Sequence, residues 1–483
     1  MRRERAEKIP FDRMKKGILT VPPRSAFCQK ERQTGRRTRG NAQRSQRRNT
    51  GPAEKVVKCL LVGVVLFVVH VLPAHAQGRP GTIELKSAKE LKVRNIRGTE
   101  VRELLGSVHF IQFLREGGQV RVWSDRALQY LEAEQMELSS RVRVIRDSIL
   151  ITSDEGTYFG KERRIEVRGR VRLERSGSVL TSRAGEYFPD EKRAIFTDSV
   201  VVVDSASTLY CDKLMYWENE ARSVASGNVR VIQSSDGTTV FGDTLVNLER
   251  EKRSIVPRAA RMMQIDTAAN GEVDTLLVTS RSMESRNDSV RHLIARDSVR
   301  IARTDLSARC HVATFAGDED RITLAGDPVV WHEENQVTGD TIHIRLVRRQ
   351  LSSVFVRGRA MAVSRSDSVR RSRFDQLTGR RLTMYFAEKK VRQIDVEQTA
   401  TSLYYLYDEA VANGANMSSG DRIIIDFSDG QVDRIKIIGG VQGEYYPERM
   451  VRNREGEYNL DGFKWFRTRP KRDGVVMQEV VVE

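Results

Sequence analysis

Apolar residues recur along this chain at two intervals, a short one of two residues and a long one of 29. The segments Ser140–Val144, Arg170–Leu173, Ser199–Val202 and Asn228–Val231 align without a gap at the longer interval. Within these segments Val and Leu alternate with Arg, Ser or Asn, which indicates strands with one buried face. A fixed period of this length predicts a protein built from stacked repeats.

Each repeat contains two strand signals. Lys213–Trp217 is followed by a short polar turn, and Arg222–Ile232 then provides the second signal. Gly, Asn and Asp mark the turns, and Pro is scarce within the strands, as an unbroken hydrogen-bonded ladder requires. The spacing loosens after residue 243. We therefore expect an all-β fold of two-strand repeats, regular over residues 77–256 and less regular over residues 257–441.

The first 76 residues differ in composition from the rest of the chain. They contain 18 basic and 5 acidic residues, whereas the remainder contains 64 and 60. Residues 1–54 are Arg-rich and too poor in apolar residues to form a core, so we expect either a disordered leader or a start codon assigned too far upstream. Residues 55–76 combine two lysines, the apolar run Cys59–Leu72 and an Ala-x-Ala site, which predicts a cleaved signal peptide and export to the periplasm. Because the basic excess lies in the leader, we expect no nucleic-acid partner.

The repeat unit resembles a known family. Gly227–Ile232, a polar turn and Gly242–Leu245 together resemble the LptA/OstA-type periplasmic lipopolysaccharide-transport proteins, and this resemblance extends over roughly residues 95–445. It implies an elongated β-jellyroll, in which two antiparallel sheets form a V around an apolar interior that binds lipopolysaccharide acyl chains. The chain has more repeats than the shorter members and is closer in length to the long OstA-like proteins.

The resemblance also implies partners, which are lipopolysaccharide or a related lipid and other jellyroll proteins that pair with the exposed strand edges. The apolar positions of the repeats are the candidates for a lipid-facing interior, although the same residues would fill the core of any β-sandwich. These candidates are Val171, Leu173, Val200, Val202, Leu214, Tyr216, Val229, Val231, Ile342 and Ile344.

The end of the chain breaks the repeat pattern. Residues 442–483 include the aromatic residues Phe463, Trp465 and Phe466. Such a segment is typical of a cap over the last repeat or of a docking site for a partner protein, because aromatic residues are enriched in both. Both interpretations remain open from the sequence.

No catalytic motif accompanies the repeats, and we expect no enzyme activity, no cofactor and no metal site. His332 and His343 could approach each other, but two histidines without a third ligand do not indicate zinc. One rival interpretation is a polysaccharide-active enzyme on a β-helix, which needs carboxylates clustered on one face. Asp125, Asp154 and Asp212 recur at the repeat interval, but Arg183 takes the intervening place, which suggests a salt-bridged ladder. A second rival is a structural or adhesive filament of the envelope.

Cys211 and Cys310 lie about three repeats apart. Three rungs at about 4.8 Å would separate them by roughly 14 Å, beyond the span of about 7 Å that a disulfide allows between Cα atoms. We therefore predict two free thiols.

Overall fold

The computed structural model describes residues 83–472, except residue 97 and the segments 115–116, 176, 268–272, 288–290, 317–319, 348–349, 367–369 and 409–410. All of them belong to the unit His75–Glu483. The basic leader (1–54), the signal-peptide segment (55–76) and residues 473–483 lie outside the described residues, so these predictions are not addressed by the structure.

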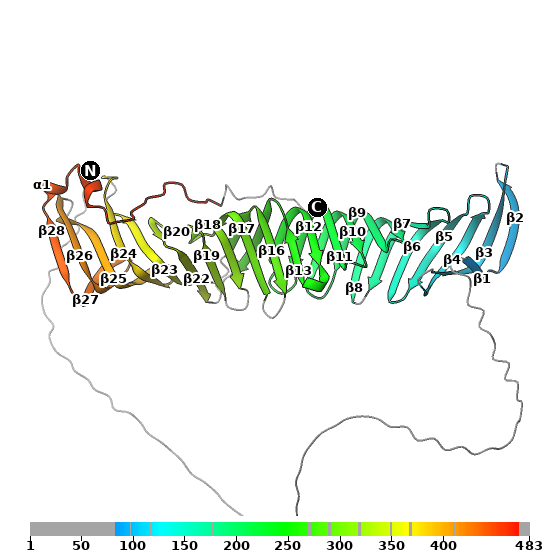
Figure 1. The fold of residues 1–483 in the computed structure, drawn as a ribbon, viewed down its shortest axis with the longest axis horizontal. Helices are drawn as coiled ribbons and strands as arrows, with labels where there is room; N and C mark the ends of the chain where they lie inside the picture. The colour runs from blue at the N-terminus through cyan, green and yellow to red at the C-terminus, as the bar shows by residue number, and fades with distance from the viewer. Residues whose placement is uncertain are drawn as a thin grey trace, which may run out of the picture. The chain divides into compact units, whose positions relative to one another are not determined.

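The described residues are organised almost entirely as β-strands (Figure 1). The first strands are β1 (Ile83–Ser87), β2 (Glu90–Ile96), β3 (Thr99–Phe113), β4 (Gln119–Tyr130), β5 (Gln135–Arg146), β6 (Ile149–Phe159), β7 (Arg164–Arg175), β8 (Ser178–Phe188), β9 (Arg193–Val203), β10 (Ser207–Trp217), β11 (Arg222–Gln233), β12 (Thr239–Leu248), β13 (Arg253–Val256) and β14 (Ala260–Thr267).

The later strands are β15 (Val273–Ser280), β16 (Ser282–Asn287), β17 (Arg291–Ala302), β18 (Ser307–Ala316), β19 (Arg321–Ala325), β20 (Val329–His332), β21 (Asn335–Thr338), β22 (Thr341–Val347), β23 (Gln350–Arg365), β24 (Phe374–Ala387), β25 (Lys390–Asp408), β26 (Val411–Ser428), β27 (Gln431–Ile438) and β28 (Gln442–Tyr446). A short helix, α1 (Glu448–Val451), follows them.

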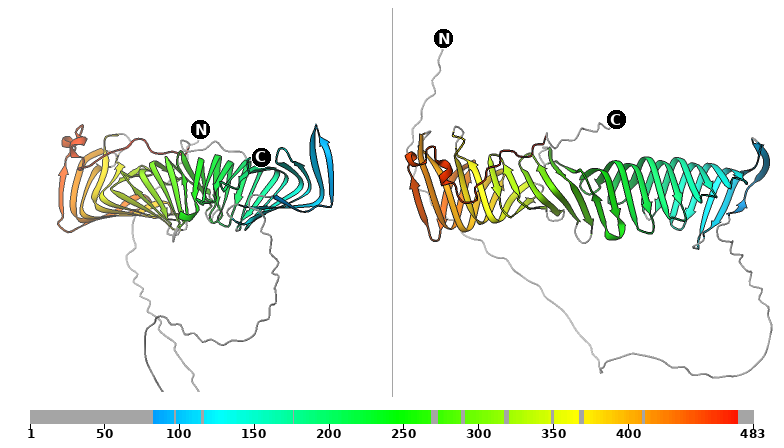
Figure 2. Two further views of the ribbon diagram at one scale, coloured as in Figure 1. Left: turned by 45° about the vertical axis from the view of Figure 1, so that its right-hand side comes forward. Right: turned by 45° about the horizontal axis from the view of Figure 1, so that its top comes forward.

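The strands form one continuous antiparallel ladder, so the prediction of an all-β fold is confirmed. Strands β5, β7, β9 and β11 each begin 29 residues after the previous one. Where the sequence pattern loosens, long strands are replaced by pairs of short ones, and β12 pairs with both β13 and β14. The ladder is therefore continuous across residue 257, where the regular and irregular repeats meet (Figure 2).

Most long strands bend in the middle at a β-bulge, where the pairing register shifts. Residues with positive φ mark these corners at the repeat interval: Ser140 and Arg141 in β5, Gly169 in β7, Asp198 and Ser199 in β9, and Gly227 and Asn228 in β11. A bulge places an extra residue in one strand and bends it sharply. Each strand therefore contributes one half to each of two facing sheets.

An aspartate of the neighbouring strand fills many of these corners. Asp154 accepts hydrogen bonds from the backbone N–H of Arg170 at 3.1 Å and from its guanidinium at 2.8 Å. The hydrogen bond from the Arg170 side chain holds the pKa of Asp154 below its usual value. Asp125 accepts hydrogen bonds from the guanidinium of Arg141, and Asp212 accepts one from the side-chain amide of Asn228. The salt bridges of Asp125 and Asp154 thus cross to the next bulge, rather than joining a ladder with Arg183 along the stack.

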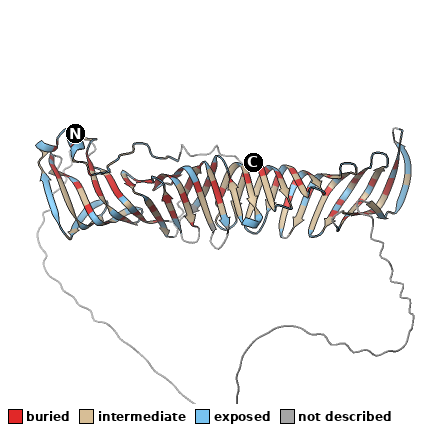
Figure 3. Cartoon of the chain, in the orientation of Figure 1, coloured by how far each residue is buried: buried red, intermediate tan, exposed pale blue. Residues whose placement is uncertain are grey.

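The core lies between the two half-sheets. Buried residues recur from strand to strand along the ladder (Figure 3). In β7, Ile165 and Val167 before the corner and Leu173 after it line one and the same cavity. Because both halves of a single strand face this space, the two sheets enclose it as the arms of a V.

Replacing Gly169 by alanine tests the corner geometry, because Gly169 has a φ of +81° and an added Cβ would lie 2.5 Å from Oδ2 of Asp154. Gly177 is a matched control, with a φ of +84° and no atom within 4 Å of an added Cβ. A positive φ alone costs about 1–2 kcal/mol for an alanine. In urea unfolding, Gly169→Ala should lower stability more than Gly177→Ala, and adding Asp154→Ala should recover part of the difference. Equal losses for the two glycines would contradict a close-packed corner.

Candidate lipid-binding cavity

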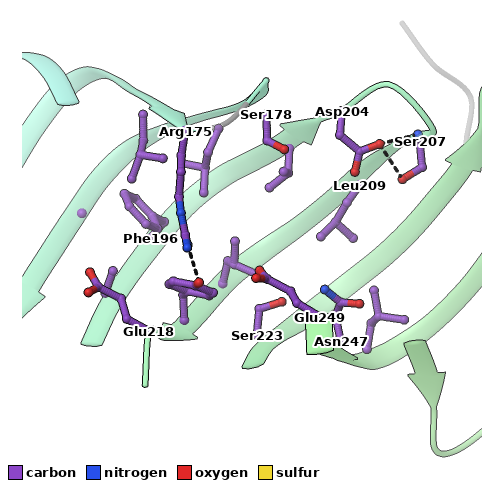
Figure 4. Close-up of a pocket in the computed structure, with 18 of the residues that line it drawn as sticks. Arg175, Ser178, Phe196, Asp204, Ser207, Leu209, Glu218, Ser223, Asn247 and Glu249 are labelled. Carbon is purple, nitrogen blue, oxygen red and sulfur yellow. Dashed lines mark hydrogen bonds between the residues drawn. The ribbon is translucent and has the colours of Figure 1, made fainter. Parts of the chain in front are cut away.

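A cavity of about 610 Å³ lies between the half-sheets, lined by strands from β4 to β17. Its walls are mainly aliphatic and aromatic side chains, and its volume falls in the range of about 300–1,000 Å³ that is usual for small-molecule sites. Residues from both sheets point into this space (Figure 4). The cavity can therefore hold an apolar group out of water.

Polarity changes in a regular way from the corner to the open side of the V. In β7, Val171 beside the corner is 1% exposed, Leu173 two residues on is half-buried, and Arg175 two residues further lies at the open side. Strand β11 repeats this order with Val229, Val231 and Gln233. Because alternate residues of a strand share a face, each strand contributes one buried, one half-buried and one polar position. The cavity is thus apolar at depth and polar at its mouth.

Polar side chains from both sheets meet at this mouth. Arg175 donates a hydrogen bond to the hydroxyl of Tyr216, drawn as a dashed line from Arg175 in Figure 4. Nη1 of Arg146 lies 3.7 Å from Oε2 of Glu218, and the hydroxyl of Tyr187 donates to the same carboxylate at 3.3 Å. The hydrogen bond to Tyr216 also raises the pKa of Arg175. The contacts of Arg175 with Tyr216 and of Arg146 with Glu218 join the arms of the V, and these side chains provide both donors and acceptors for a polar group at the cavity entrance.

The structure separates the sequence candidates into two groups. Five of them line the cavity: Leu173, Val202, Leu214, Tyr216 and Val231. The other five, namely Val171, Val200, Val229, Ile342 and Ile344, are at most 2% exposed and are packed in the core. Ile342 and Ile344 belong to β22, beyond the strands that line the cavity. Contact of any of these residues with lipid stays a prediction.

Sequence reasoning missed the polar residues of the mouth and several apolar ones, including Leu180, Phe196 and Leu209. Some of the mouth residues could have been found from the sequence, because Arg175 and Gln233 each lie four residues after the valine beside the corner of their repeat. The residues that face them, such as Glu218, come from the opposite ends of other strands, and only the folded V brings the two sets together.

The aromatic residues proposed for docking pack against their own chain. Residues 447–472, which we call the C-terminal segment, fold back along the outer face of one sheet. Rings of Phe463 and Trp465 lie 5.4 and 4.9 Å from the ring of Phe374, and Phe466 stacks under Arg309 at 4.2 Å. Gln336 binds the backbone of this segment at Lys464 and Phe466. A docking role for these aromatics stays a prediction.

A buried arginine anchors the start of this segment. Arg373 is fully buried and donates hydrogen bonds to Glu448 at 2.8 Å and to Glu455 at 3.3 Å. Burial lowers the pKa of Arg373, but the hydrogen bonds to these carboxylates and their negative charge raise it by more, so the net change is upward. Arg373 directly precedes β24, so these hydrogen bonds connect the C-terminal segment to the start of that strand.

Within the described part of the chain, no group of His, Cys, Asp and Glu is arranged to hold a metal ion. His332 and His343 have separate partners, the carbonyl of Lys389 and the hydroxyl of Thr323. None of the helices among the described residues has the length and apolar character needed to cross a membrane.

Comparison with known proteins agrees with the family resemblance. The family described as OstA-like protein matches residues 81–187, which include β1 to β7 and most of β8. These residues form an OstA-like domain. A solved structure of LptH from Pseudomonas aeruginosa, described as the LptA-homologous periplasmic component of the lipopolysaccharide transport device, matches with 13% identity and a TM-score of 0.23. The match covers 29% of this chain and 95% of that one. No curated protein sequence matches significantly.

The OstA-like domain ends near the middle of the cavity. The cavity lining begins at Val120 in β4 and continues to Leu293 in β17, whereas the family match ends at residue 187. The strands after β8 therefore extend, without a break in the ladder, the wall that the OstA-like domain begins.

The two thiols of the described chain are buried and unpaired, which confirms the prediction for Cys211 and Cys310. Burial raises the pKa of Cys211 to about 11 and that of Cys310 to about 12. Because the thiolate is the reactive form, neither residue should react with a thiol reagent at pH 8 in the folded protein. In denaturant both should react within minutes. Rapid labelling of either cysteine under native conditions would contradict its burial, and tandem mass spectrometry would identify the site.

Proposed function

We propose that this protein binds the acyl chains of lipopolysaccharide or a related lipid in the cavity and shields them from water in the periplasm, on the way to the outer membrane. The observation that carries the proposal is the change in polarity from corner to mouth. It matches an amphiphile whose chains lie at depth and whose polar part lies at the mouth. Each CH₂ removed from water contributes about 0.8 kcal/mol, so a chain of roughly twelve carbons gains on the order of 9 kcal/mol.

The ends of the ladder support a role in a chain of similar proteins. Within the described residues, β1 and β2 pair only with β3, and β27 and β28 pair only with β26. Both ends expose apolar side chains, which are Leu85, Leu91 and Val93 at one end and Val432, Ile435, Ile438, Val441 and Tyr445 at the other. Unpaired edges of this kind favour strand addition from another chain. We propose that they join other jellyroll proteins, and that a membrane partner supplies the energy for lipid movement.

The aspartates at the corners argue against an enzymatic role. Asp125 and Asp154, which could have formed an acidic cluster, are each bound to an arginine at a corner. A carboxylate held in this way is a poor general acid, because its pKa is lowered rather than raised. A structural filament remains the second candidate function, since the exposed edges favour it too.

A photocrosslinking amino acid at Val202 or Val231 tests lipid binding in cells. Both side chains line the cavity, and we expect crosslinks to lipopolysaccharide at each. Val203 is the matched control, because it lies on the same strand, is 45% exposed and points to the opposite face. It should capture little or no lipid. Crosslinks from Val202 and Val231 to protein alone would overturn the proposal and favour the filament.

A further inference from the structure

A second concave site lies outside the V, between residues of β18, β20, β21 and β23 to β25 and the C-terminal segment. This groove, of about 1420 Å³, is lined by six basic side chains, namely Arg309, Arg357, Arg359, Arg380, Arg381 and Lys464, and by three acidic ones, Asp327, Asp340 and Asp461. Its strands are distinct from those that line the cavity, because the cavity lining ends at β17. The lipid proposal does not account for this basic surface.

The basic character begins with a change at one corner. The corner just before β22 and the corner within β26 begin with Gly and Asp, at Asp340 and Asp421, but in β24 the residue after Gly379 is Arg380. Arg183 makes the same change in β8, where the opposing bulge contains Asp198. The bulge opposite Arg380 consists of Gln398 and Thr399 and contains no carboxylate.

The neighbours of Arg380 increase this positive charge. Arg357 and Arg381 lie directly opposite each other in the pairing of β23 with β24, and like charges in that arrangement destabilise a sheet. Glu397 lies 3.3 Å from Arg381, and Asp340 is occupied by Arg359 at 2.5 Å. Over the described residues, no ion pair joins a carboxylate to Arg357, Arg380 or Lys464. Three cations thus face the groove without a counterion.

We propose that this groove binds a phosphate-bearing saccharide. Guanidinium groups match phosphate oxygens in a bidentate fashion, and Arg357 and Arg380 provide two such groups on adjacent strands. The hydroxyls of Thr338, Thr378, Thr399 and Thr401 and the carboxylate of Asp461 also line the groove. They supply the neutral and acceptor groups that sugar hydroxyls require. The saccharide is either the head of a lipid or a lipid-free envelope polymer, and its binding is independent of the acyl-chain cavity.

Calorimetric titration with two probes tests this site. The first probe is a phosphorylated oligosaccharide obtained from lipopolysaccharide by removing all acyl chains, and the second is the same oligosaccharide after phosphatase treatment. The first should bind, with an affinity that falls as salt is added, and the second should bind at least about tenfold more weakly, as expected when charge-assisted hydrogen bonds are lost. If intact lipopolysaccharide binds at this groove no better than the acyl-free probe, the saccharide alone is sufficient for binding there.

The substitution Arg380→Asp gives the decisive variant. It places at this corner the residue type that the equivalent positions Asp340 and Asp421 already have. It should fold normally, as judged by urea unfolding, and lose affinity for the phosphorylated probe by about tenfold or more. Arg183→Asp makes the same change of charge at a corner outside the groove and should leave the affinity unchanged. Lys464→Gln should weaken binding from the other wall.

Three results would overturn the proposal: equal binding of the two probes, unchanged affinity in a folded Arg380→Asp variant, or tighter binding of a polyglutamate peptide than of the saccharide. Crosslinking at Val202 should be unaffected by Arg380→Asp. A failure at the groove is therefore distinguishable from a failure of lipid binding in the cavity.

Discussion

The structure depends on how a continuous β-ladder turns a corner without losing its hydrogen bonds. A flat stack of these strands would expose one apolar face along its length, and bending every strand at the same height folds that face onto itself. The bend requires backbone with positive φ at each corner, which Gly169, Gly227 and Gly358 provide at no steric cost. Aspartates such as Asp154 and Asp340 then satisfy the bulge. The 29-residue spacing of the first corners keeps them in line.

Once the corners are fixed, the character of each position follows from its distance to them. The first inward residue after the corner is packed at the apex, as Val171 and Val200 are. The next lies where the arms have diverged, and the third reaches solvent. Where side chains such as Leu382 and Ile423 are fully buried, the arms are closely packed. Between β4 and β17, half-buried residues such as Leu209 and Val231 line a cavity between the arms. The arms are therefore closely packed in one part of the ladder and enclose a cavity in another.

Much of the fold could be predicted from the sequence, because a period of two within a longer repeat specifies both the strand and its buried face. The valines at the corners were found in this way, and so were the free thiols of Cys211 and Cys310. What the sequence could not reveal were contacts between distant segments. Gln336 binds the backbone at Phe466, and Arg373 binds Glu448, although nothing in the local pattern joins these pairs. Likewise, the unusual charge of Arg380 is recognised only when the corner of β24 is compared with the corresponding corners of the other strands.

The proposed function requires that acyl chains lie between the arms of the V in the part formed by β4 to β17. Crystals of the protein with a lipid whose acyl chains contain bromine would test it directly, because anomalous scattering locates the bromine atoms. We expect the bromine atoms within the cavity, among Leu173, Leu209 and Val231. Bromine atoms on the outer faces of the sheets, or beneath the C-terminal segment, with an empty cavity, would contradict it.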